Sequence, residues 1–379
     1  MKKKILVFHP ALAPYRIDFF NQIDKACDAT FYFTRQRMIE QRFDDNALRS
    51  QTHITSYFMK DTWHWGNKEF SKGYRQAFKK HQPDIIIGSE LSMTTWRPLL
   101  HKLWRKATHW CTHKPIPEVW SIIDDSLPIA TQWKGSALLQ RRILIPLLDQ
   151  FIVVNDQVAD FFLTTYALKK RPIVMPIIQE DTRFHHKLEL ALPLTQHYIQ
   201  QYKLQHTRIL LFVGRLVPLK GVDRLIAAFC TSSPTPFDRL IIVGEGESLE
   251  TLKAQVANTP YKEQILFVGR YEDIALYAWY LLGQTFTLCS DSEAFGAVVN
   301  EALLAGMPVL CTEVAGATSL ITKTNGAIFP YKDINRLSKL IQQYLYQQAP
   351  LGDTITIRPS LMPFSFESCM KQVLKSLLS

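Results

Sequence analysis

Two glutamates, Glu293 and Glu301, are the residues whose type and spacing point most directly to chemistry. They are eight residues apart in a stretch predicted to be helical, slightly more than two turns, so both carboxylates can face one cleft. A carboxylate there can accept two hydrogen bonds from the vicinal hydroxyls of a ribose or a hexose. The amides of residues 295–297 would face phosphate oxygens at the same helix start. The alternative is that Glu293 only caps the helix and Glu301 is solvated.

Two cations, Arg215 and Lys220, lie in a turn that suits a diphosphate. The turn has the sequence GRLVPLKG over residues 214–221, after a strand predicted to end at Val213 and ahead of a predicted helix. The amides at a helix N-terminus and cationic side chains attract the same negative charge. Taken alone, this pattern also fits solvated surface cations.

These residues follow strands in a repeating alternation of short apolar runs and helix-length segments. Such an alternation is typical of parallel sheets with crossover helices. Strands are predicted at residues 4–9, 29–33, 84–88, 118–123 and 151–155, and again at 208–213, 239–243, 264–268, 285–289 and 308–311. The fold class is therefore α/β, with two doubly wound domains whose ligands bind at the carboxyl ends of the strands.

The chain of 379 residues is too long for one ordinary core and suits two domains. We expect the first domain over residues 1–180 and the second over residues 201–355. A segment with Pro176 and Pro193 among polar residues would link them. The last part, 356–379, contains an amphipathic run that we expect to form a helix, either packed back on the first domain or lying on the surface.

The net charge of +10 is concentrated in the first half of the chain. Lysines and arginines outnumber acids by nine in residues 1–190 and by one in residues 191–379. This asymmetry indicates an anionic partner, either a membrane surface or a polyanion. Residues 96–110 interleave tryptophan and leucine with cations and contain no acid, which favours an anionic lipid surface. The alternative is that the apolar residues pack into the core and the cations are solvated.

Export and metal-binding signals are weak in this sequence. The apolar run at the N-terminus is far shorter than a signal-peptide core, and no apolar stretch reaches the roughly 18 to 20 residues that span a bilayer. The six cysteines have neither paired nor metal-ligand spacing. We therefore expect a cytoplasmic protein with reduced thiols, either soluble or peripheral on the cytoplasmic face of the membrane, and no metal site.

Four segments together resemble a known family. They are GRLVPLKG (214–221), IIVGEGE (241–247), ILFVGR (265–270) and SDSEAFGAVVNEALLAGMPVL (290–310). The sequence resembles the retaining nucleotide-sugar glycosyltransferases of GT-B fold, family 4 or glycosyl transferases group 1, to which sucrose synthase belongs. The resemblance implies two Rossmann-like domains facing across a cleft, the first binding the acceptor and the second the nucleotide-sugar.

The resemblance also implies roles for individual residues. Arg215 and Lys220 would hold the donor diphosphate, and Glu293 would contact the donor sugar; these three are the predicted catalytic residues. Glu301 would bind the ribose, and Arg270 with Tyr271 would lie at the nucleobase. The full predicted donor site consists of Gly214, Arg215, Lys220, Arg270, Glu293, Phe295, Gly296, Ala297, Val298 and Glu301.

The reaction that the resemblance implies is transfer of a hexose-type sugar, with retention, from a nucleoside-diphosphate donor to a saccharide acceptor. The acceptor would be lipid-linked, in bacterial-type surface polysaccharide or glycolipid synthesis. Such enzymes need no cofactor and no divalent metal, since cations and helix dipoles stabilise the leaving diphosphate. The nucleobase, the sugar and the acceptor stay open.

Other functions compete with this interpretation. A GT-B epimerase or phosphorylase would share the architecture. A basic nucleic-acid-binding protein would explain the charge, but it has no use for the paired glutamates, so no nucleic-acid partner is expected. A nicotinamide-dependent oxidoreductase would need G-x-G-x-x-G directly after a strand, and neither half of the chain supplies it.

The first domain departs from the commoner family pattern, because a glycine-rich loop does not follow its first strand. Its polar residues still follow predicted strands, where they could bind acceptor hydroxyls or take up the acceptor proton. These acceptor-side candidates are His9, Tyr15, Arg16, Glu90, Asp124 and Asp125. Helix capping is the alternative role for each of them.

Overall fold

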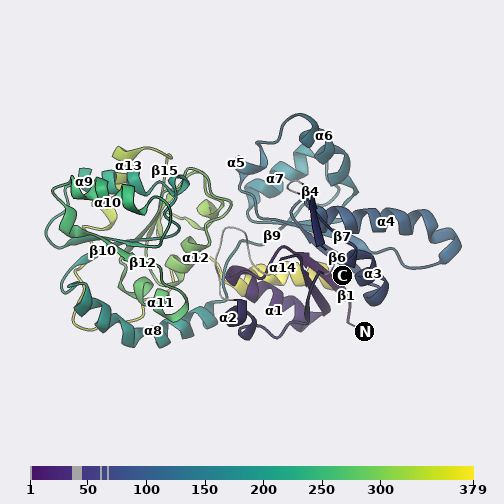
Figure 1. Ribbon diagram of the computed structural model, residues 1–379, viewed down its shortest axis with the longest axis horizontal. Helices are drawn as coiled ribbons and strands as arrows, with labels where there is room; N and C mark the ends of the chain where they lie inside the picture. Colours follow the sequence, from purple (N-terminus) through teal and green to yellow (C-terminus); the bar gives the residue numbers. More distant parts are fainter. Residues whose placement is uncertain (1, 36–44, 60–61, 66–67) are drawn as a thin grey trace. The chain divides into compact units, whose positions relative to one another are not determined.

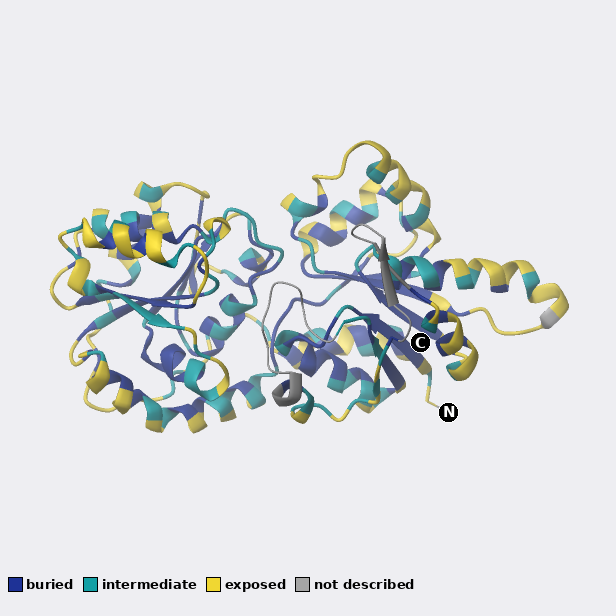
Figure 2. Ribbon diagram, viewed as in Figure 1, coloured by how far each residue is buried: buried dark blue, intermediate teal, exposed yellow. Residues whose placement is uncertain are grey.

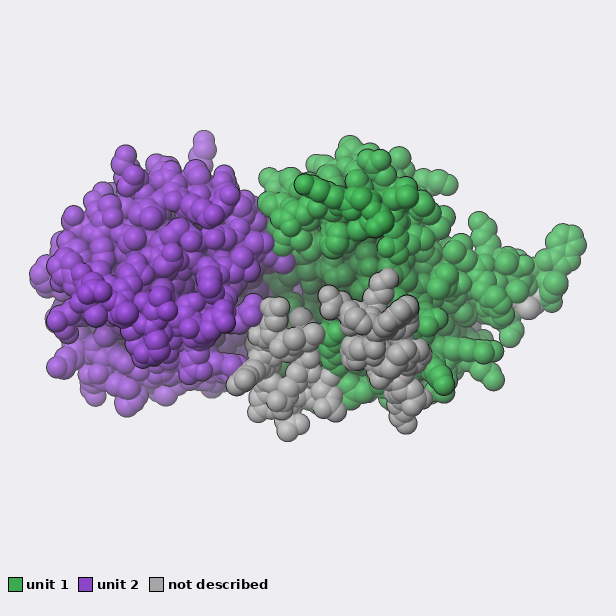
Figure 3. All heavy atoms as spheres, turned by 45° about the horizontal axis from the view of Figure 1, so that its top comes forward, with its two compact units in different colours: residues 1–177, 367–379 green, residues 178–366 purple. Residues whose placement is uncertain are grey.

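The computed structural model describes residues 2–35, 45–59, 62–65 and 68–379. The chain divides into two compact units (Figure 3). Unit 1 comprises residues 1–177 together with 367–379, and unit 2 comprises residues 178–366. Each unit is built around its own parallel sheet (Figure 1).

The sheet of unit 1 has seven parallel strands in the order β3-β2-β1-β6-β7-β8-β9. Their bounds are β1 Lys4–His9, β2 Asp28–Phe33, β3 Ser56–Phe58, β6 Ile85–Ser89, β7 Glu118–Ile123, β8 Gln150–Val153 and β9 Ile173–Val174, and a separate antiparallel pair joins β4 Thr62–Trp65 to β5 Lys68–Ser71. The central strands are apolar and buried, as parallel strands covered on both faces must be (Figure 2). The strand order reverses at β1, which pairs with both β2 and β6, so the loops after β1 and β6 are where ligands are expected.

The helices of unit 1 connect and cover these strands. They are α1 Ile17–Ala26, α2 Asp45–Ser50, α3 Gly73–His81, α4 Met93–Thr112, α5 Leu127–Ala130, α6 Gly135–Leu144, α7 Asp156–Thr165 and α14 Phe366–Leu378, with short 3₁₀ turns η1 Pro14–Arg16 and η2 Ile145–Leu147. The long helix α4 begins at Ser92, whose side chain accepts a hydrogen bond from the amide of Thr94. Helix α14, drawn in yellow, lies with the elements of unit 1 and buries Met370, Val373 and Leu377 (Figure 1).

The sheet of unit 2 has six parallel strands in the order β12-β11-β10-β13-β14-β15. Their bounds are β10 Arg208–Val213, β11 Asp238–Val243, β12 Ile265–Gly269, β13 Thr285–Leu288, β14 Val309–Thr312 and β15 Gly326–Phe329. The helices are α8 Asp181–Gln201, α9 Val222–Thr231, α10 Leu249–Ala257, α11 Asp273–Leu282, α12 Ala297–Leu304 and α13 Ile334–Tyr344, with 3₁₀ turns η3 Pro218–Lys220, η4 Lys262–Gln264 and η5 Gly316–Leu320. Here the order reverses at β10, between β11 and β13. The two doubly wound sheets confirm the predicted α/β class.

The segment expected to link the domains is instead a helix of unit 2. Helix α8 occupies residues 181–201 and packs along α11. The Glu180 side chain accepts hydrogen bonds from the first amides of the helix, and Phe184 and Leu188 bury its apolar face. The polar residues that suggested a linker lie on the outer face, and Pro193 lies within the helix.

A close approach of two backbone segments in unit 2 leads to a prediction. Gly244 has a φ of +151°, and a Cβ atom there would lie 1.9 Å from the carbonyl oxygen of Gly214. We expect Gly244→Ala to lower the free energy of unfolding by about 1 to 3 kcal/mol, the usual cost of a backbone conformation that only glycine adopts. Calorimetry would measure the loss. The control is Gly352→Ala, because a Cβ there meets no atom within 4 Å. Equal stability of both variants would contradict the assigned geometry.

Candidate functional site

The two loops that carry the predicted donor residues are joined directly in unit 2. Because β10 and β13 are neighbours in a parallel sheet, the loops that follow them start at the same edge. The amide of Asp291 donates a hydrogen bond of 2.8 Å to the carbonyl oxygen of Leu219. The Cys289 thiol donates to the carbonyl of Lys220 at 3.2 Å. The segments 214–221 and 289–296 therefore form one continuous polar surface.

Lys220 and Glu293 form an ion pair on this surface. The Ser290 hydroxyl donates to the same carboxylate oxygen of Glu293 at 3.1 Å. The two charged side chains are 15% and 16% exposed, so the pair is accessible at its edge and partly withdrawn from water. Arg224 and Asp291 form a second ion pair nearby. The structure thus brings together the residue expected to bind the diphosphate and the residue expected to bind the donor sugar.

Two helix N-termini lie at the same edge of the sheet. Helix α9 begins at Gly221, with φ +65°, and α12 begins at Gly296, with φ +95°. Both glycines let the chain turn sharply from loop to helix, where other residues would be strained. The positive ends of the two helix dipoles add to the charge of the lysine. Phe295 is buried beneath α12, whereas Ala297 and Val298, the first residues of that helix, are partly exposed.

Glu301 lies one turn further along α12 in a preorganised hydrogen-bond network. The Tyr280 hydroxyl donates to one carboxylate oxygen at 2.6 Å, and the Gln179 side-chain amide donates to the other at 2.7 Å. Burial raises the pKa of Glu301 above its ordinary value. The backbone amide of Gln179 is fixed in turn by Asn300, at 2.8 Å. A carboxylate has about four acceptor positions, so the two hydrogen bonds leave room for ribose hydroxyls.

Gln179, Tyr280 and Asn300 were missed by the sequence analysis. Gln179 lies in the segment predicted to be a linker. Tyr280 lies in an apolar helix, whose sequence suggests a role in the hydrophobic core. Asn300 directly precedes Glu301 in the sequence. An amide side chain next to a predicted site residue in an apolar helix indicates a hydrogen-bonding role, because a buried amide needs a partner.

The remaining predicted donor residues lie after neighbouring strands. Gly214 and Arg215 directly follow β10, and the amide of Gly214 donates to the carbonyl of Val243 at 3.0 Å. Arg215 is partly exposed. Arg270 follows β12 and forms an ion pair with Glu272. The neighbouring Tyr271 hydroxyl is hydrogen bonded to the hydroxyl of Tyr202 at 2.9 Å, a contact that orients its ring.

In unit 1, the ends of β1, β6 and β7 carry a polar cluster whose members are buried or partly exposed. Arg16, only 1% exposed, forms an ion pair with Asp124. The backbone amide of Asp124 donates to the side chain of Glu90 at 2.8 Å. Glu90 itself adopts a left-handed conformation, with φ +56°, which is uncommon for a residue other than glycine. His9, also buried, directs its Nδ1 to the carbonyl of Ala11 at 2.7 Å.

Burial shifts the protonation of this cluster. Burial, with the nearby Asp125 and Asp124 carboxylates, raises the pKa of Glu90 well above its ordinary value. It also raises the pKa of Asp125, lowers the pKa of His9 to about 4 and raises the pKa of Tyr15 to about 12. At neutral pH His9 and Tyr15 are therefore uncharged. All six residues predicted on the acceptor side interact within this one cluster: His9, Tyr15, Arg16, Glu90, Asp124 and Asp125.

The basic stretch of residues 96–110 forms most of α4, and its cations are less available than its sequence suggests. The Lys102 ammonium is paired with both carboxylate oxygens of Asp149, at 2.7 Å each. Arg105 is buried, at 9% exposure. Lys106 is exposed on α4, and Arg142 is exposed on α6. The described residues include no group of three or more histidine, cysteine, aspartate or glutamate side chains that could hold a metal ion.

Comparison with known proteins places unit 2 in a family. Residues 196–354 match the family model described as Glycosyl transferases group 1. Unit 2 is a glycosyl transferases group 1 domain. A putative teichuronic acid biosynthesis glycosyltransferase, TuaC, of Bacillus subtilis (strain 168) is 29% identical over 169 residues, 45% of this chain and 38% of that protein. The chain therefore spans well under half the length of this curated relative. The family predicted from the four sequence segments is confirmed.

Solved structures extend the likeness to the whole chain. Anabaena Alr3699/HepE in complex with UDP-glucose has a TM-score of 0.71 at 17% identity, over 99% of both chains. WaaG, a glycosyltransferase involved in lipopolysaccharide biosynthesis, has a TM-score of 0.60 at 17% identity, over 90% of both chains. At this identity the likeness concerns the fold, and the predicted GT-B fold is confirmed.

The ion pair in unit 1 leads to a stability prediction. Asp124→Asn leaves the buried Arg16 guanidinium without a carboxylate, so we expect it to lower the free energy of unfolding by about 3 to 5 kcal/mol. Urea unfolding would measure the loss. The matched control is Asp156→Asn, because Asp156 and its partner Arg171 are both exposed. That change should cost less than about 1 kcal/mol. Similar losses for the two variants would contradict the buried character of the Arg16 pair.

Proposed function

We propose that the protein is a retaining glycosyltransferase that moves a hexose-type sugar from a nucleoside-diphosphate donor to a saccharide acceptor. The observation that carries the proposal is the Lys220–Glu293 pair, set between two helix N-termini, with Glu301 further along the second helix. The group 1 domain supports the transferase class. Relatives named for teichuronic acid synthesis and for mannosyl transfer to a phosphatidylinositol monomannoside support a role in surface polysaccharide or glycolipid synthesis.

In the proposed reaction, the leaving diphosphate replaces Glu293 as the partner of Lys220. Arg215, the lysine and the helix N-termini then stabilise the negative charge that develops as the sugar leaves. The released Glu293 carboxylate accepts hydrogen bonds from the sugar hydroxyls, and Glu301 accepts those of the ribose. We propose that the reaction needs neither a cofactor nor a divalent metal, because these groups supply the positive charge. Retention of configuration is the stereochemical outcome that the family resemblance favours.

The donor is proposed to be a nucleotide-sugar with either UDP or GDP as carrier. Alr3699/HepE was solved with UDP-glucose, whereas a Corynebacterium glutamicum relative, 30% identical over 140 residues, is named as GDP-mannose-dependent. A titration against UDP, GDP, ADP and their sugars would identify the base. Analysis of the product would separate a transferase from a GT-B epimerase, which releases no glycoside, and from a phosphorylase, which consumes phosphate.

The Lys220–Glu293 pair generates the sharpest test of the donor site. We expect Lys220→Ala to weaken nucleoside-diphosphate binding about 10- to 100-fold, because it removes a charge-assisted contact of about 1.5 to 3 kcal/mol. Glu293→Gln should keep or improve the affinity for the diphosphate, because Lys220 then has no ion pair to break before it binds. Turnover of the same variant should fall. Calorimetric titration and a product assay would measure both.

The control for the donor test is Lys253→Ala, whose lysine pairs with Glu250 on the exposed face of α10. It should bind and turn over like the unchanged protein. The assignment would be wrong if Glu293→Gln weakened diphosphate binding as much as Lys220→Ala.

The acceptor is proposed to be a saccharide bound by the polar cluster of unit 1 and carried on a lipid. The cluster offers both hydrogen-bond donors and acceptors at neutral pH, as recognition of several hydroxyls requires. Among the described residues, no helix is long and apolar enough to cross a bilayer. We therefore propose that the protein meets its acceptor by docking reversibly on an anionic membrane surface.

An exposed apolar face of unit 1, which we call the α4–α6 face, supports this docking. Nine of the sixteen large hydrophobic side chains that are exposed among the described residues lie between residues 100 and 147. On the two helices they are Leu100, Leu103, Trp104, Trp110, Leu139 and Ile143. Apolar side chains with cations beside them suit the interface of an anionic membrane.

Sedimentation with lipid vesicles tests the docking. The cations to change are the exposed Lys106, Lys134 and Arg142, rather than the paired Lys102 or the buried Arg105. Replacing all three by glutamine should weaken binding to anionic vesicles more than tenfold, since each contributes about 1 kcal/mol near such a surface.

The matched control for this test changes three exposed lysines of unit 2, Lys253, Lys262 and Lys323, to glutamine. Both variants lose the same net charge, so only the location of the charge differs. Equal binding by the two variants, or failure of the unchanged protein to bind at low salt, would exclude docking through the α4–α6 face.

A further inference from the structure

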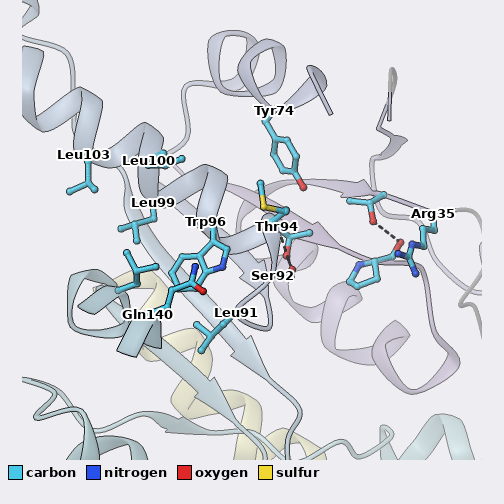
Figure 4. Close-up of a pocket in the computed structure, with 14 residues that line it drawn as sticks. Arg35, Tyr74, Leu91, Ser92, Thr94, Trp96, Leu99, Leu100, Leu103 and Gln140 are labelled. Carbon is cyan, nitrogen blue, oxygen red and sulfur yellow. Dashed lines mark hydrogen bonds between the residues drawn. The ribbon is translucent and has the colours of Figure 1, made fainter. Parts of the chain in front are cut away.

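A cavity of about 520 Å³ in unit 1 is lined by residues of α4 and α6 and also by Pro10, Thr34, Arg35 and Tyr74 (Figure 4). Its volume lies within the range of about 300 to 1,000 Å³ that small-molecule sites occupy. Trp96 and Leu99 of α4 and Leu144 of α6 form its apolar wall. Figure 4 shows the indole of Trp96 beside the side chain of Gln140, with the leucines of α4 along the same side.

One end of the cavity is continuous with the α4–α6 face. Leu100 and Leu103 line the cavity and are nevertheless 57% and 37% exposed, so they form its apolar mouth. Trp104 and Ile143 are also exposed on the same two helices. Soluble monomers rarely leave contiguous apolar surface of this kind uncovered without a binding role.

The other side of the cavity reaches the strand ends that carry the polar cluster of unit 1, although none of the six residues of that cluster lines the cavity. Pro10 and Leu91 line the cavity, and each directly follows a member of the cluster, His9 and Glu90 respectively. The cavity therefore reaches the ends of two strands, β1, which ends in His9, and β6, which is followed by Glu90. A ligand with an apolar tail and a sugar head would satisfy both regions at once.

We propose that this cavity binds the hydrocarbon chain of the lipid that carries the acceptor saccharide. The inference rests on the proposed glycosyltransferase function and deepens it by assigning the acceptor's tail to a site. The chain enters between Leu100 and Leu103 from the α4–α6 face, which carries cations suited to an anionic lipid. Its head group then lies toward His9 and Glu90. A free saccharide would leave the apolar wall unused.

A maltoside detergent brominated in the middle of a dodecyl chain is a direct probe, because bromine quenches tryptophan fluorescence on contact. Below its micelle concentration, the probe should quench the unchanged protein, and Trp96→Phe should remove most of that quenching. Unbrominated octyl, decyl and dodecyl maltosides should compete, with affinity rising about fourfold for each methylene that the cavity holds. Because no donor is present, the readout is independent of turnover.

A pair of matched variants separates the cavity from the rest of the surface. Gln140→Phe fills the cavity from an exposed position on α6, and Gln157→Phe makes the same change at an exposed position on α7. We expect Gln140→Phe to weaken quenching about tenfold while Gln157→Phe leaves it unchanged. If Gln140→Phe fails to fold, Leu103→Gln at the mouth should weaken quenching similarly.

Four results would overturn the proposal. They are absence of quenching in the unchanged protein, quenching that persists in full in Trp96→Phe, quenching that is equal in the two phenylalanine variants, and competition that does not depend on chain length. Failure of the glycosyltransferase proposal gives a different result, namely chain-dependent quenching without transfer from any nucleotide-sugar. A protein occupant instead of a lipid chain would also show as absence of quenching by the probe.

Discussion

Lys220 and Glu293 are far apart in the chain and can form an ion pair only because β10 and β13 are neighbours in a parallel sheet. In such a sheet every carboxyl end meets the same edge, and the strand order reverses at β10. The loops after the two strands must therefore lie side by side, and each leads into a helix whose positive end faces that edge. The proposed donor chemistry depends on this topology first, and only then on the particular side chains.

The same constraint gives a different result in unit 1. The reversal at β1 brings His9, Glu90 and Asp124 to one edge, where burial lowers the pKa of His9 and raises the pKa of Glu90. The Arg16 guanidinium of unit 1 is only 1% exposed, whereas the two side chains of the Lys220–Glu293 pair in unit 2 are 15% and 16% exposed. A site that must release a charged diphosphate benefits from access to water, whereas a site that recognises neutral hydroxyls benefits from uncharged, preorganised donors and acceptors. The two polar clusters thus fit the two halves of the proposed transfer.

Much of this could be predicted from the sequence, because strands, turns and the GRLVPLKG and EAFGAVVNE segments depend on local patterns. The errors arose where a long-range contact decides the structure. The sequence of α8 suggests a linker, but in the structure this segment is a helix that packs against α11. Tyr280 lies in an apolar segment that suggests a core position, but its hydroxyl donates a hydrogen bond to Glu301. The sequence around Lys102 suggests a free surface cation, but in the structure Asp149, from another segment, forms an ion pair with it. The sequence pattern of one segment cannot predict a contact with a residue that lies far away in the chain.

The structure of α4 changes which interaction would drive the proposed docking on a membrane. Charge counted along the sequence suggests an electrostatic surface, yet Lys102 is neutralised by Asp149 and Arg105 is buried, whereas Trp104 and Trp110 remain exposed. Burial of an exposed apolar side chain yields about 1.5 to 3 kcal/mol, compared with about 1 kcal/mol for a cation near an anionic surface. Apolar insertion should therefore dominate, with charge selecting the lipid. The proposed tail site opens on the same face, so a lipid chain would reach it from the bilayer without crossing water.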